Sequence, residues 1–362
     1  MSEMLLIRAD ASARMGTGHV MRCLALAQGW QRHGGKVLFL QAETTPALEQ
    51  LLAREGVVLS RLEARPGTVA DAEHTIAFAR KHSAAWVVAD GYHFDANYQR
   101  AIKAAGLRLL LFDDYGHADF YSADLVLNQN LGADPALYQR REAHTRLLLG
   151  TRYVLLREEF LDMQDWKREI PAVGNKVLVT MGGSDPDNVT GKVIQALKQF
   201  SEIETKVVIG GSNPHVQSLQ SSIIHHPSSI QLVVDANNMP ELMAWADVAI
   251  AAGGSTSWEL AFMGLPSLVC TLADNQRAIS AALELEGVSA SLGQPDHGAL
   301  LSLPQRLQAI LSRREQRSRM SGLGRRLVDG GGSTRVVEFL ITNVPSHTEN
   351  RTVSVCHNHF LV

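Results

Sequence analysis

The sequence predicts an α/β protein of two similar halves that face each other across a cleft. Short apolar runs alternate with longer amphipathic stretches, which is typical of parallel strands joined by crossover helices. Each half also opens in the same way, with an apolar strand, a glycine-containing loop and the start of a helix, once from Leu5 and again from Lys176. A length of 362 residues suits two domains of ordinary size.

The bulk composition narrows the functional class. Hydrophobic residues make up 45% of the chain, enough for two full cores, and the net charge of −3 points to neither a nucleic acid nor an anionic membrane as partner. The chain opens without the apolar region of a signal peptide. No apolar run reaches the roughly 18 residues that indicate a membrane span. We therefore expect a cytoplasmic protein without a membrane span.

Cysteine and histidine usage gives no sign of a metal centre. Cys23, Cys270 and Cys356 are widely separated, which fits a reducing compartment and neither a disulfide framework nor a zinc site. The pair at 225–226 and the tail at 356–359 carry possible metal ligands without a partner cluster. We predict no metal and no cofactor.

The N-terminal half begins with a βαβ unit. Leu5–Ile7 is a short apolar strand, residues 8–19 form a loop, Val20–Arg32 has helical periodicity, and Lys36–Leu40 is the next strand. The crossover is expected to be right-handed in a parallel sheet.

The loop of this unit is not a dinucleotide fingerprint. Gly16 and Gly18 fit its first half, but the third glycine position holds Met21, and Glu43 alone is a weak ribose signal. The loop instead places His19 at a helix N-terminus, where the dipole disfavours the cation and favours a neutral base. The alternative is a surface or capping histidine.

Polar residues end the strands that follow. In an open α/β sheet the carboxyl ends of the strands form the binding edge, although each such residue alone is also common in turns. The segments are Trp86–Asp90, Arg108–Asp114 and Asp124–Asn128.

A charged stretch broken by Pro171, within residues 161–176, reads as a linker. Strand and helix patterns then resume at Lys176–Thr180, Val189–Phe200, Lys206–Gly211 and Ile230–Val234. The predicted organisation is an N-terminal domain over 1–165, a C-terminal domain over 172–343 that ends in a helix from Thr334 to Thr342, and a disordered tail over 345–362.

The strongest local signal is the glycine turn at 253–259. It follows the apolar strand at 246–252 and precedes a helix. Free amides at a helix start, two glycines and the hydroxyls of Ser255 and Thr256 can cradle phosphates. Glu259 lies on the same helical face as Ser255 and can accept hydrogen bonds from a ribose diol. An ordinary capped helix is the alternative.

With these motifs in place, the chain resembles a known family over roughly residues 4–340. The family is that of the UDP-sugar hydrolases of pseudaminic acid biosynthesis, which are relatives of the MurG-type glycosyltransferases with the GT-B fold. The resemblance rests on these runs: Arg8-x-Asp10-x-Ser12-x-x-x-Gly16-x-Gly18-His19-x-x-Arg22, Asp90-x-Tyr92, Phe112-Asp113-Asp114, Tyr153-x-x-Leu156-Arg157-x-Glu159-Phe160, Met181-Gly182-Gly183-Ser184-Asp185, Gly253-Gly254-Ser255-Thr256 and Asp274-Asn275-Gln276.

The resemblance implies two Rossmann-like domains and a defined reaction. Water would cleave the anomeric C–O bond of UDP-2,4-diacetamido-2,4,6-trideoxy-β-L-altropyranose, releasing UDP and the free sugar with inversion, in a pathway of flagellin glycosylation. His19 would be the base, with Asp10 and Tyr92 around the sugar. The implied substrate-binding residues are Gly18, Arg22, Met181, Gly182, Gly183, Gly254, Ser255, Thr256, Glu259, Asn275 and Gln276.

Two other functions remain open. One is a MurG-like transferase that passes the sugar to an acceptor, although no apolar and basic docking patch is evident in the N-terminal half. The other is a non-catalytic protein that binds a UDP-sugar. A hydrolysing epimerase would need acidic residues that cannot be matched here. In each case the partner is a small-molecule UDP-sugar rather than a nucleic acid, and a cleft within one chain favours a monomer.

Overall fold

The computed structural model describes residues 3–12, 15–223, 229–295 and 297–343. The tail at 345–362, the pair at 225–226 and Cys356 lie outside these residues. Among the described residues, no group of three or more histidine, cysteine or acidic side chains is placed to hold a metal ion. Nor does any helix in these ranges have the length and apolar character needed to cross a membrane.

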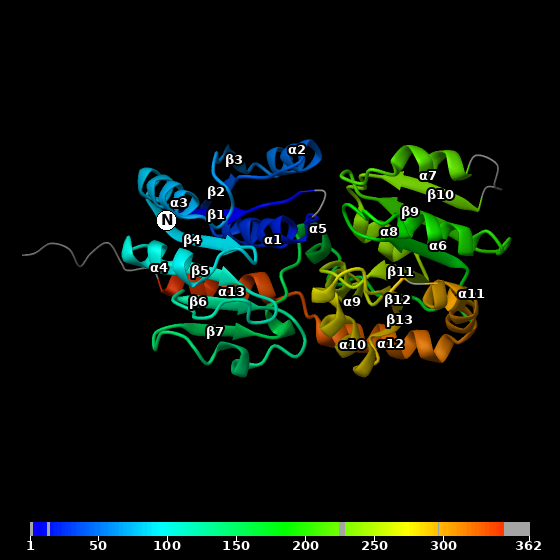
Figure 1. Ribbon diagram of the computed structural model, residues 1–362. Coiled ribbons are helices and arrows are strands. Elements are labelled where there is room, and N and C mark those ends of the chain that lie inside the picture. The colour runs from blue at the N-terminus through cyan, green and yellow to red at the C-terminus, as the bar shows by residue number, and fades with distance from the viewer. Residues whose placement is uncertain (1–2, 13–14, 224–228, 296, 344–362) are drawn as a thin grey trace, which may run out of the picture.

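Within the described residues, the N-terminal domain is built on a parallel sheet of seven strands in the order β3-β2-β1-β4-β5-β6-β7 (Figure 1). The strands are β1 (Met4–Ala9), β2 (Lys36–Gln41), β3 (Val58–Arg61), β4 (Ala84–Asp90), β5 (Leu109–Phe112), β6 (Leu125–Asn128) and β7 (Arg146–Leu149). The helices are α1 (Gly18–Arg32), α2 (Pro46–Arg54), α3 (Val69–Lys81), α4 (Ala96–Ala104) and α5 (Glu158–Leu161), with short 3₁₀ turns η1 (Pro135–Tyr138) and η2 (Thr151–Tyr153).

The C-terminal domain repeats this plan with a parallel sheet in the order β10-β9-β8-β11-β12-β13. Its strands are β8 (Lys176–Thr180), β9 (Glu204–Ile209), β10 (Ile230–Val234), β11 (Val248–Ala252), β12 (Ser267–Cys270) and β13 (Ser289–Gly293). Its helices are α6 (Val189–Leu197), α7 (Val216–Ile223), α8 (Met239–Trp245), α9 (Thr256–Phe262), α10 (Arg277–Leu285), α11 (His297–Ser312) and α12 (Arg314–Leu327), with the 3₁₀ turn η3 (Asp274–Gln276). The predicted fold class, two Rossmann-like α/β domains, is confirmed.

Local sequence explains where helices begin and end. Thr45 and Asp95 accept hydrogen bonds from first-turn amides of α2 and α4, as N-cap side chains do. Beyond the end of α1, Gly34 takes a left-handed φ of 80°, a conformation that costs glycine little.

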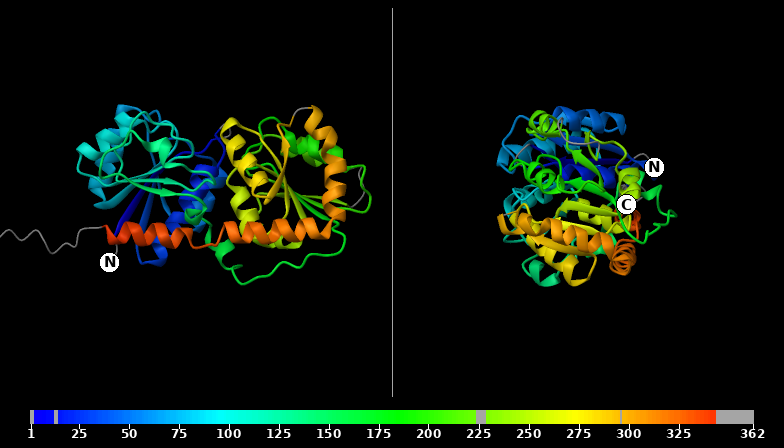
Figure 2. Two further views of the ribbon diagram at one scale, coloured as in Figure 1. Left: turned by 90° about the horizontal axis from the view of Figure 1, so that it is seen from below. Right: turned by 90° about the vertical axis from the view of Figure 1, so that its right-hand side faces the viewer.

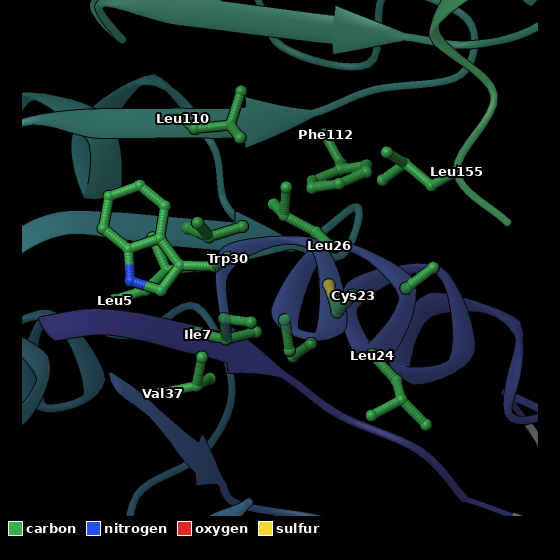
Figure 3. Close-up of a cluster of buried hydrophobic side chains, with 14 of the residues drawn as sticks. Leu5, Ile7, Cys23, Leu24, Leu26, Trp30, Val37, Leu110, Phe112 and Leu155 are labelled. Carbon is green, nitrogen blue, oxygen red and sulfur yellow. The ribbon is translucent and has the colours of Figure 1, made fainter. Parts of the chain in front are cut away.

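The core of the N-terminal domain lies between the sheet and α1. Figure 3 shows Trp30 of α1 beside Leu5 and Ile7 of β1. All three side chains are buried, with at most 2% of their surface exposed. Burying large apolar side chains stabilises the domain by about 1.5–3 kcal/mol each, so the β1–α1 unit is a rigid base for the loop that joins them.

The last helix, α13 (Gly332–Thr342), packs on the N-terminal domain instead of the domain that precedes it in sequence. Figure 2 shows the chain running from α12 along one side of the molecule and back beneath the first sheet. Trp86 of β4 donates a hydrogen bond to the Leu340 carbonyl at 3.2 Å. Gly29 of α1 permits the close approach, because a Cβ there would lie 3.3 Å from the Val337 side chain. The predicted C-terminal domain, 172–343, included residues 332–342. In the structure the apolar face of these residues instead covers α1 and β4 of the N-terminal domain.

The carboxyl edges of the two sheets face each other. Loops that follow strands make two of the contacts between the domains: Thr45 after β2 meets Ser212 after β9 at 3.3 Å, and Tyr92 after β4 meets Asn275 after β12 at 3.1 Å. In each sheet the strand order reverses direction between β1 and β4 or between β8 and β11. Such switch points are where open α/β sheets bind ligands.

Candidate functional site

His19 lies at the N-terminal switch point, on the first turn of α1. Its Nδ1 is 2.7 Å from Asp90 Oδ1, at the end of neighbouring strand β4. An ionised carboxylate only accepts hydrogen bonds, so in the neutral ring this contact favours the proton on Nδ1, over the longer 3.3 Å approach of the Arg22 Nη2 donor to the same atom, and leaves the lone pair on Nε2. The side chain is 11% exposed. The imidazole is thus held in the orientation and tautomer of a general base.

A buried arginine continues the network from Asp90. The Arg22 Nε and Nη2 atoms donate to the two Asp90 oxygens at 2.6 and 2.7 Å, and its Nη1 donates to Asp114 Oδ1 at 2.8 Å. Burial alone would raise the pKa of Asp90, but Arg22 and His19 hold that pKa well below its usual range. Asp90 therefore stays ionised at neutral pH. Arg22 binds these two carboxylates in the interior of the domain, whereas the family resemblance predicts that it contacts the substrate.

Tyr92 links this network to the other domain. Its hydroxyl donates to Asp114 Oδ2 at 2.7 Å and accepts from Asn275 Nδ2 at 3.1 Å. Burial and the charge of Asp114 raise the pKa of Tyr92 far above its usual range, so the phenol remains protonated. Its ring meets the His19 ring edge-on at 5.1 Å. We call His19, Arg22, Asp90, Tyr92 and Asp114 the edge network.

Asp10 has a supporting position. It is fully buried, pairs with Arg8 at 2.7 Å, and accepts hydrogen bonds from the amides of Ala42 and Glu43. Its second oxygen lies 3.6 Å from His93 Nε2. Asp10 therefore holds the loop after β2 against the end of β1, where it pairs with Arg8 rather than with His19.

On the opposite side, the loop after β8 presents backbone to the N-terminal domain. Gly182 has a φ of 86°, and Gly183 faces Thr17, whose Oγ1 would lie 2.7 Å from a Cβ at position 183. Met181 is 3% exposed and belongs to the C-terminal core, so its side chain is placed for packing. Asp185 accepts the amides of residues 189 and 190 at 2.8 Å and so fixes the start of α6.

The glycine turn after β11 lies directly across from the start of α1. A Cβ at Gly18 would lie 3.5 Å from Ser255 Oγ, which is ordinary contact distance. Ser255 precedes α9 and makes no capping hydrogen bond with its side chain, and Thr256 begins the helix. A Cβ at Gly253 would collide with Ser280 Oγ. The glycines therefore allow this turn to pack closely, and within the described residues the Ser255 hydroxyl has no hydrogen-bond partner.

Glu259 and the loop after β12 complete the C-terminal side. Glu259 Oε1 accepts from Arg157 at 3.1 Å, and Arg157 also pairs with Glu159 at 2.8 Å. Gln276 Oε1 accepts the Leu272 amide at 2.9 Å, which holds the loop that carries Asn275.

The structure therefore gathers His19, Tyr92, Gly18, Gly183, Ser255 and Asn275 where the domains meet, with Thr256 and Gly254 in the same turn. Asp10, Arg22 and Met181 lie inside their own domains. Sequence reasoning had not assigned roles to three further residues of the site: Asp90, Asp114 and Arg157. The available signal was the acidic residue at the end of each strand beside the switch point, which by itself is a common turn residue.

Comparisons with known proteins bear on the fold and on the C-terminal domain. Residues 177–324 match the Glycosyltransferase family 28 C-terminal domain. The chain is 26% identical over 338 residues to the spore coat polysaccharide biosynthesis protein SpsG of Bacillus subtilis, covering 92% of this chain and 96% of that protein. It is 24% identical over 256 residues to the UDP-2,4-diacetamido-2,4,6-trideoxy-β-L-altropyranose hydrolase of Campylobacter jejuni, covering 69% and 85% of the two chains.

Among solved structures, MurG of Acinetobacter baumannii superposes with a TM-score of 0.62 at 16% identity, over 94% of this chain and all of that one. At this identity the likeness shows a shared GT-B fold. The chain thus has GT-B architecture, and its residues 177–324 are similar to the Glycosyltransferase family 28 C-terminal domain.

Proposed function

We propose that this protein hydrolyses a nucleotide sugar, UDP-2,4-diacetamido-2,4,6-trideoxy-β-L-altropyranose, to UDP and the free sugar. One observation carries the proposal: the His19–Asp90 pair leaves the Nε2 lone pair of His19 available at the face where the N-terminal domain meets the glycine turns of the C-terminal domain. A histidine base of this kind can take a proton from water and so make water the nucleophile.

The C-terminal domain would hold the UDP moiety. Backbone amides at Gly183 and Gly254, with the hydroxyls of Ser255 and Thr256, offer neutral donors to a diphosphate. Glu259 would accept from the ribose hydroxyls through the oxygen that Arg157 leaves available. Such donors also stabilise the charge that develops on UDP as it leaves, so we propose that the reaction requires no metal.

The chemical step involves water, the sugar and His19. His19 Nε2 takes a proton from water, and the water oxygen attacks the anomeric carbon on the face opposite UDP. The anomeric C–O bond breaks, and its electron pair leaves with UDP. The anomeric centre is thereby inverted, and His19 afterwards releases its proton to solvent. A general base of this kind is typically worth about 10²–10⁴ in rate.

A glycosyltransferase is the second candidate, favoured by the family 28 match over residues 177–324. In that case the same base would deprotonate a hydroxyl of an acceptor, and the sugar would pass to it instead of to water. A protein that only binds the UDP-sugar would have no use for the His19–Asp90 pair.

The decisive experiment is incubation of the purified protein with the UDP-sugar and EDTA, without any acceptor. We expect stoichiometric release of UDP and free sugar, with NMR of the nascent sugar showing the inverted anomer. Binding of the UDP-sugar without release would contradict hydrolysis and favour the transferase or the binding protein. Loss of release in EDTA would contradict the metal-free step.

A further inference from the structure

Tyr115 is an exposed aromatic residue in the loop after β5, and hydrogen bonds hold the backbone of that loop in place. Its side chain is 49% exposed, and among the described residues it is the only aromatic one in the set of exposed large hydrophobic side chains. Within those residues its hydroxyl has no hydrogen-bond partner. Exposing an aromatic ring to water costs free energy that burial would recover, so its position calls for an explanation.

The loop that carries Tyr115 is organised around one buried carboxylate. Asp113 Oδ1 accepts from the amides of Tyr115 and Gly116 at 2.8 and 2.7 Å. Its Oδ2 lies 3.0 Å from His117 Nδ1 and accepts from the Tyr121 hydroxyl at 2.5 Å. Asp113 is only 1% exposed. These contacts fix the backbone of the loop and therefore the position from which the Tyr115 side chain extends.

The ring points toward the edge network. Its centroid is 5.0 Å from that of Tyr92, and the His117 ring lies 5.7 Å from Tyr92 and 6.3 Å from Tyr115. Tyr92 in turn contacts His19 and receives the hydrogen bond from Asn275. Because β1, β4 and β5 are neighbours in the sheet, the three rings of His19, Tyr92 and Tyr115 follow one another along the carboxyl edge.

From this arrangement we infer that Tyr115 is a specificity-determining residue that contacts the apolar face of the glycosyl group. The inference rests on the proposed function, which places the anomeric carbon beside His19. A sugar held there extends along the same edge, over Tyr92 and toward Tyr115. Deoxy carbons and acetamido methyl groups are apolar and pack on aromatic rings, whereas UDP is held by the other domain. Tyr115 therefore recognises the sugar and not the nucleotide.

The test compares Tyr115→Ala and Tyr115→Phe with Phe120→Ala, an aromatic truncation in the same loop. Steady-state release of UDP from the UDP-diacetamido-trideoxy-altrose gives KM and kcat, and inhibition by UDP gives the affinity for the nucleotide alone. Loss of an aromatic contact is expected to raise KM about ten-fold in Tyr115→Ala. Tyr115→Phe, Phe120→Ala and every UDP inhibition constant are expected to stay within about two-fold of the parent value.

Calorimetry separates this inference from the proposed reaction. In a His19→Ala background, Tyr115→Ala is expected to weaken binding of the UDP-sugar about ten-fold and to leave binding of UDP unchanged. This readout holds even if the protein releases no UDP. Equal weakening for both ligands would show a structural defect, and no weakening for either would show that the ring touches no sugar; each result overturns the inference.

Discussion

The two carboxyl edges are built on the same backbone plan and carry opposite chemistry. The N-terminal edge holds charged groups in close pairs: Arg22 joins Asp90 to Asp114, and His19 completes the chain. The C-terminal edge holds glycines, hydroxyls and an amide, among them Gly183, Ser255 and Asn275, and the carboxylate of Glu259 there is paired with Arg157. The two domains thus share one backbone plan, but the N-terminal edge is rich in paired charges and the C-terminal edge offers mainly neutral hydrogen-bond donors.

Electrostatics explains this division. Buried carboxylates are tolerated on the N-terminal edge because Arg22 satisfies both of them, and removing one partner would leave an uncompensated buried charge. The same carboxylates would repel a diphosphate. A neutral edge that offers backbone amides and hydroxyls accepts an anion without that repulsion. Each prediction below alters one edge and asks whether the other keeps its role.

The largest effect is expected from His19→Ala. Removing the base should lower kcat by about 10²–10⁴, while binding of UDP, which we assign to the opposite edge, should change less than about two-fold. Steady-state turnover assays measure kcat, and calorimetry measures the affinity for UDP. A parallel fall in kcat and UDP affinity would contradict the assignment of catalysis to the N-terminal edge and of UDP binding to the C-terminal edge.

A somewhat smaller loss is expected from Asp90→Asn. An amide can present either its oxygen or its NH₂ group to Nδ1, so it no longer holds His19 in the Nδ1–H tautomer, and kcat should fall roughly 10- to 100-fold, as for other residues that orient a catalytic side chain. Because Asp90 also pairs with Arg22, unfolding by denaturant is needed as a control for stability. Unchanged kcat in a folded variant would remove Asp90 from the mechanism, and lost UDP affinity would indicate damage beyond the N-terminal edge.

The sequence was enough to predict the central strands, the glycine loops and the two-domain class, because these depend on local periodicity and turn residues. The edge strands β3, β7 and β13 were not predicted. It also singled out His19 and the turn at 253–256. The Arg22–Asp90 pair was out of reach, since its members are 68 positions apart and nothing in the sequence specifies which buried charges meet. Arg22 therefore reads as a ligand contact until the fold shows its partners.

Helix α13 illustrates the same limit on a larger scale. The sequence predicts a last helix from Thr334 to Thr342, and the structure has that helix at Gly332–Thr342. The pattern cannot say which of two similar sheets it covers. The choice depends on long-range contacts such as the one between Val337 and Gly29, two residues that lie near opposite ends of the sequence.

A third prediction concerns the contact between the edges. A methyl group at Gly183 would lie 2.7 Å from Thr17 Oγ1, so Gly183→Ala should hold the domains apart and weaken binding of the UDP-sugar about ten-fold. Adding Thr17→Ala removes the colliding atom and should restore most of the affinity. Gly18→Ala, whose Cβ would meet Ser255 at an ordinary 3.5 Å, is the matched control. If the second substitution brings no rescue, the loss comes from contact of the new methyl group with ligand instead of from domain contact.

The smallest effect is a pH dependence confined to the N-terminal edge. Burial lowers the pKa of His117, but its hydrogen bond to Asp113 and the charge of that carboxylate outweigh burial, so the pKa is raised overall. The pair therefore stabilises the fold fully below the unfolded histidine pKa near 6.5, and this contribution is lost as pH rises through the folded value. The difference in unfolding free energy between the parent and His117→Gln should be larger at pH 5.5 than at pH 8.5.

Denaturant titrations at the two pH values measure that difference, and an Asp113→Asn background supplies the control. Without the carboxylate, His117 loses the interaction that raises its pKa, and the pH dependence of the His117→Gln difference should disappear. Persistence of the dependence in that background would place its origin in Asp114, the other acidic group that raises the pKa of His117. Because Asp113 also fixes the backbone of Tyr115, the same variant should weaken binding of the UDP-sugar more than binding of UDP, which ties the stability of this loop to recognition of the sugar.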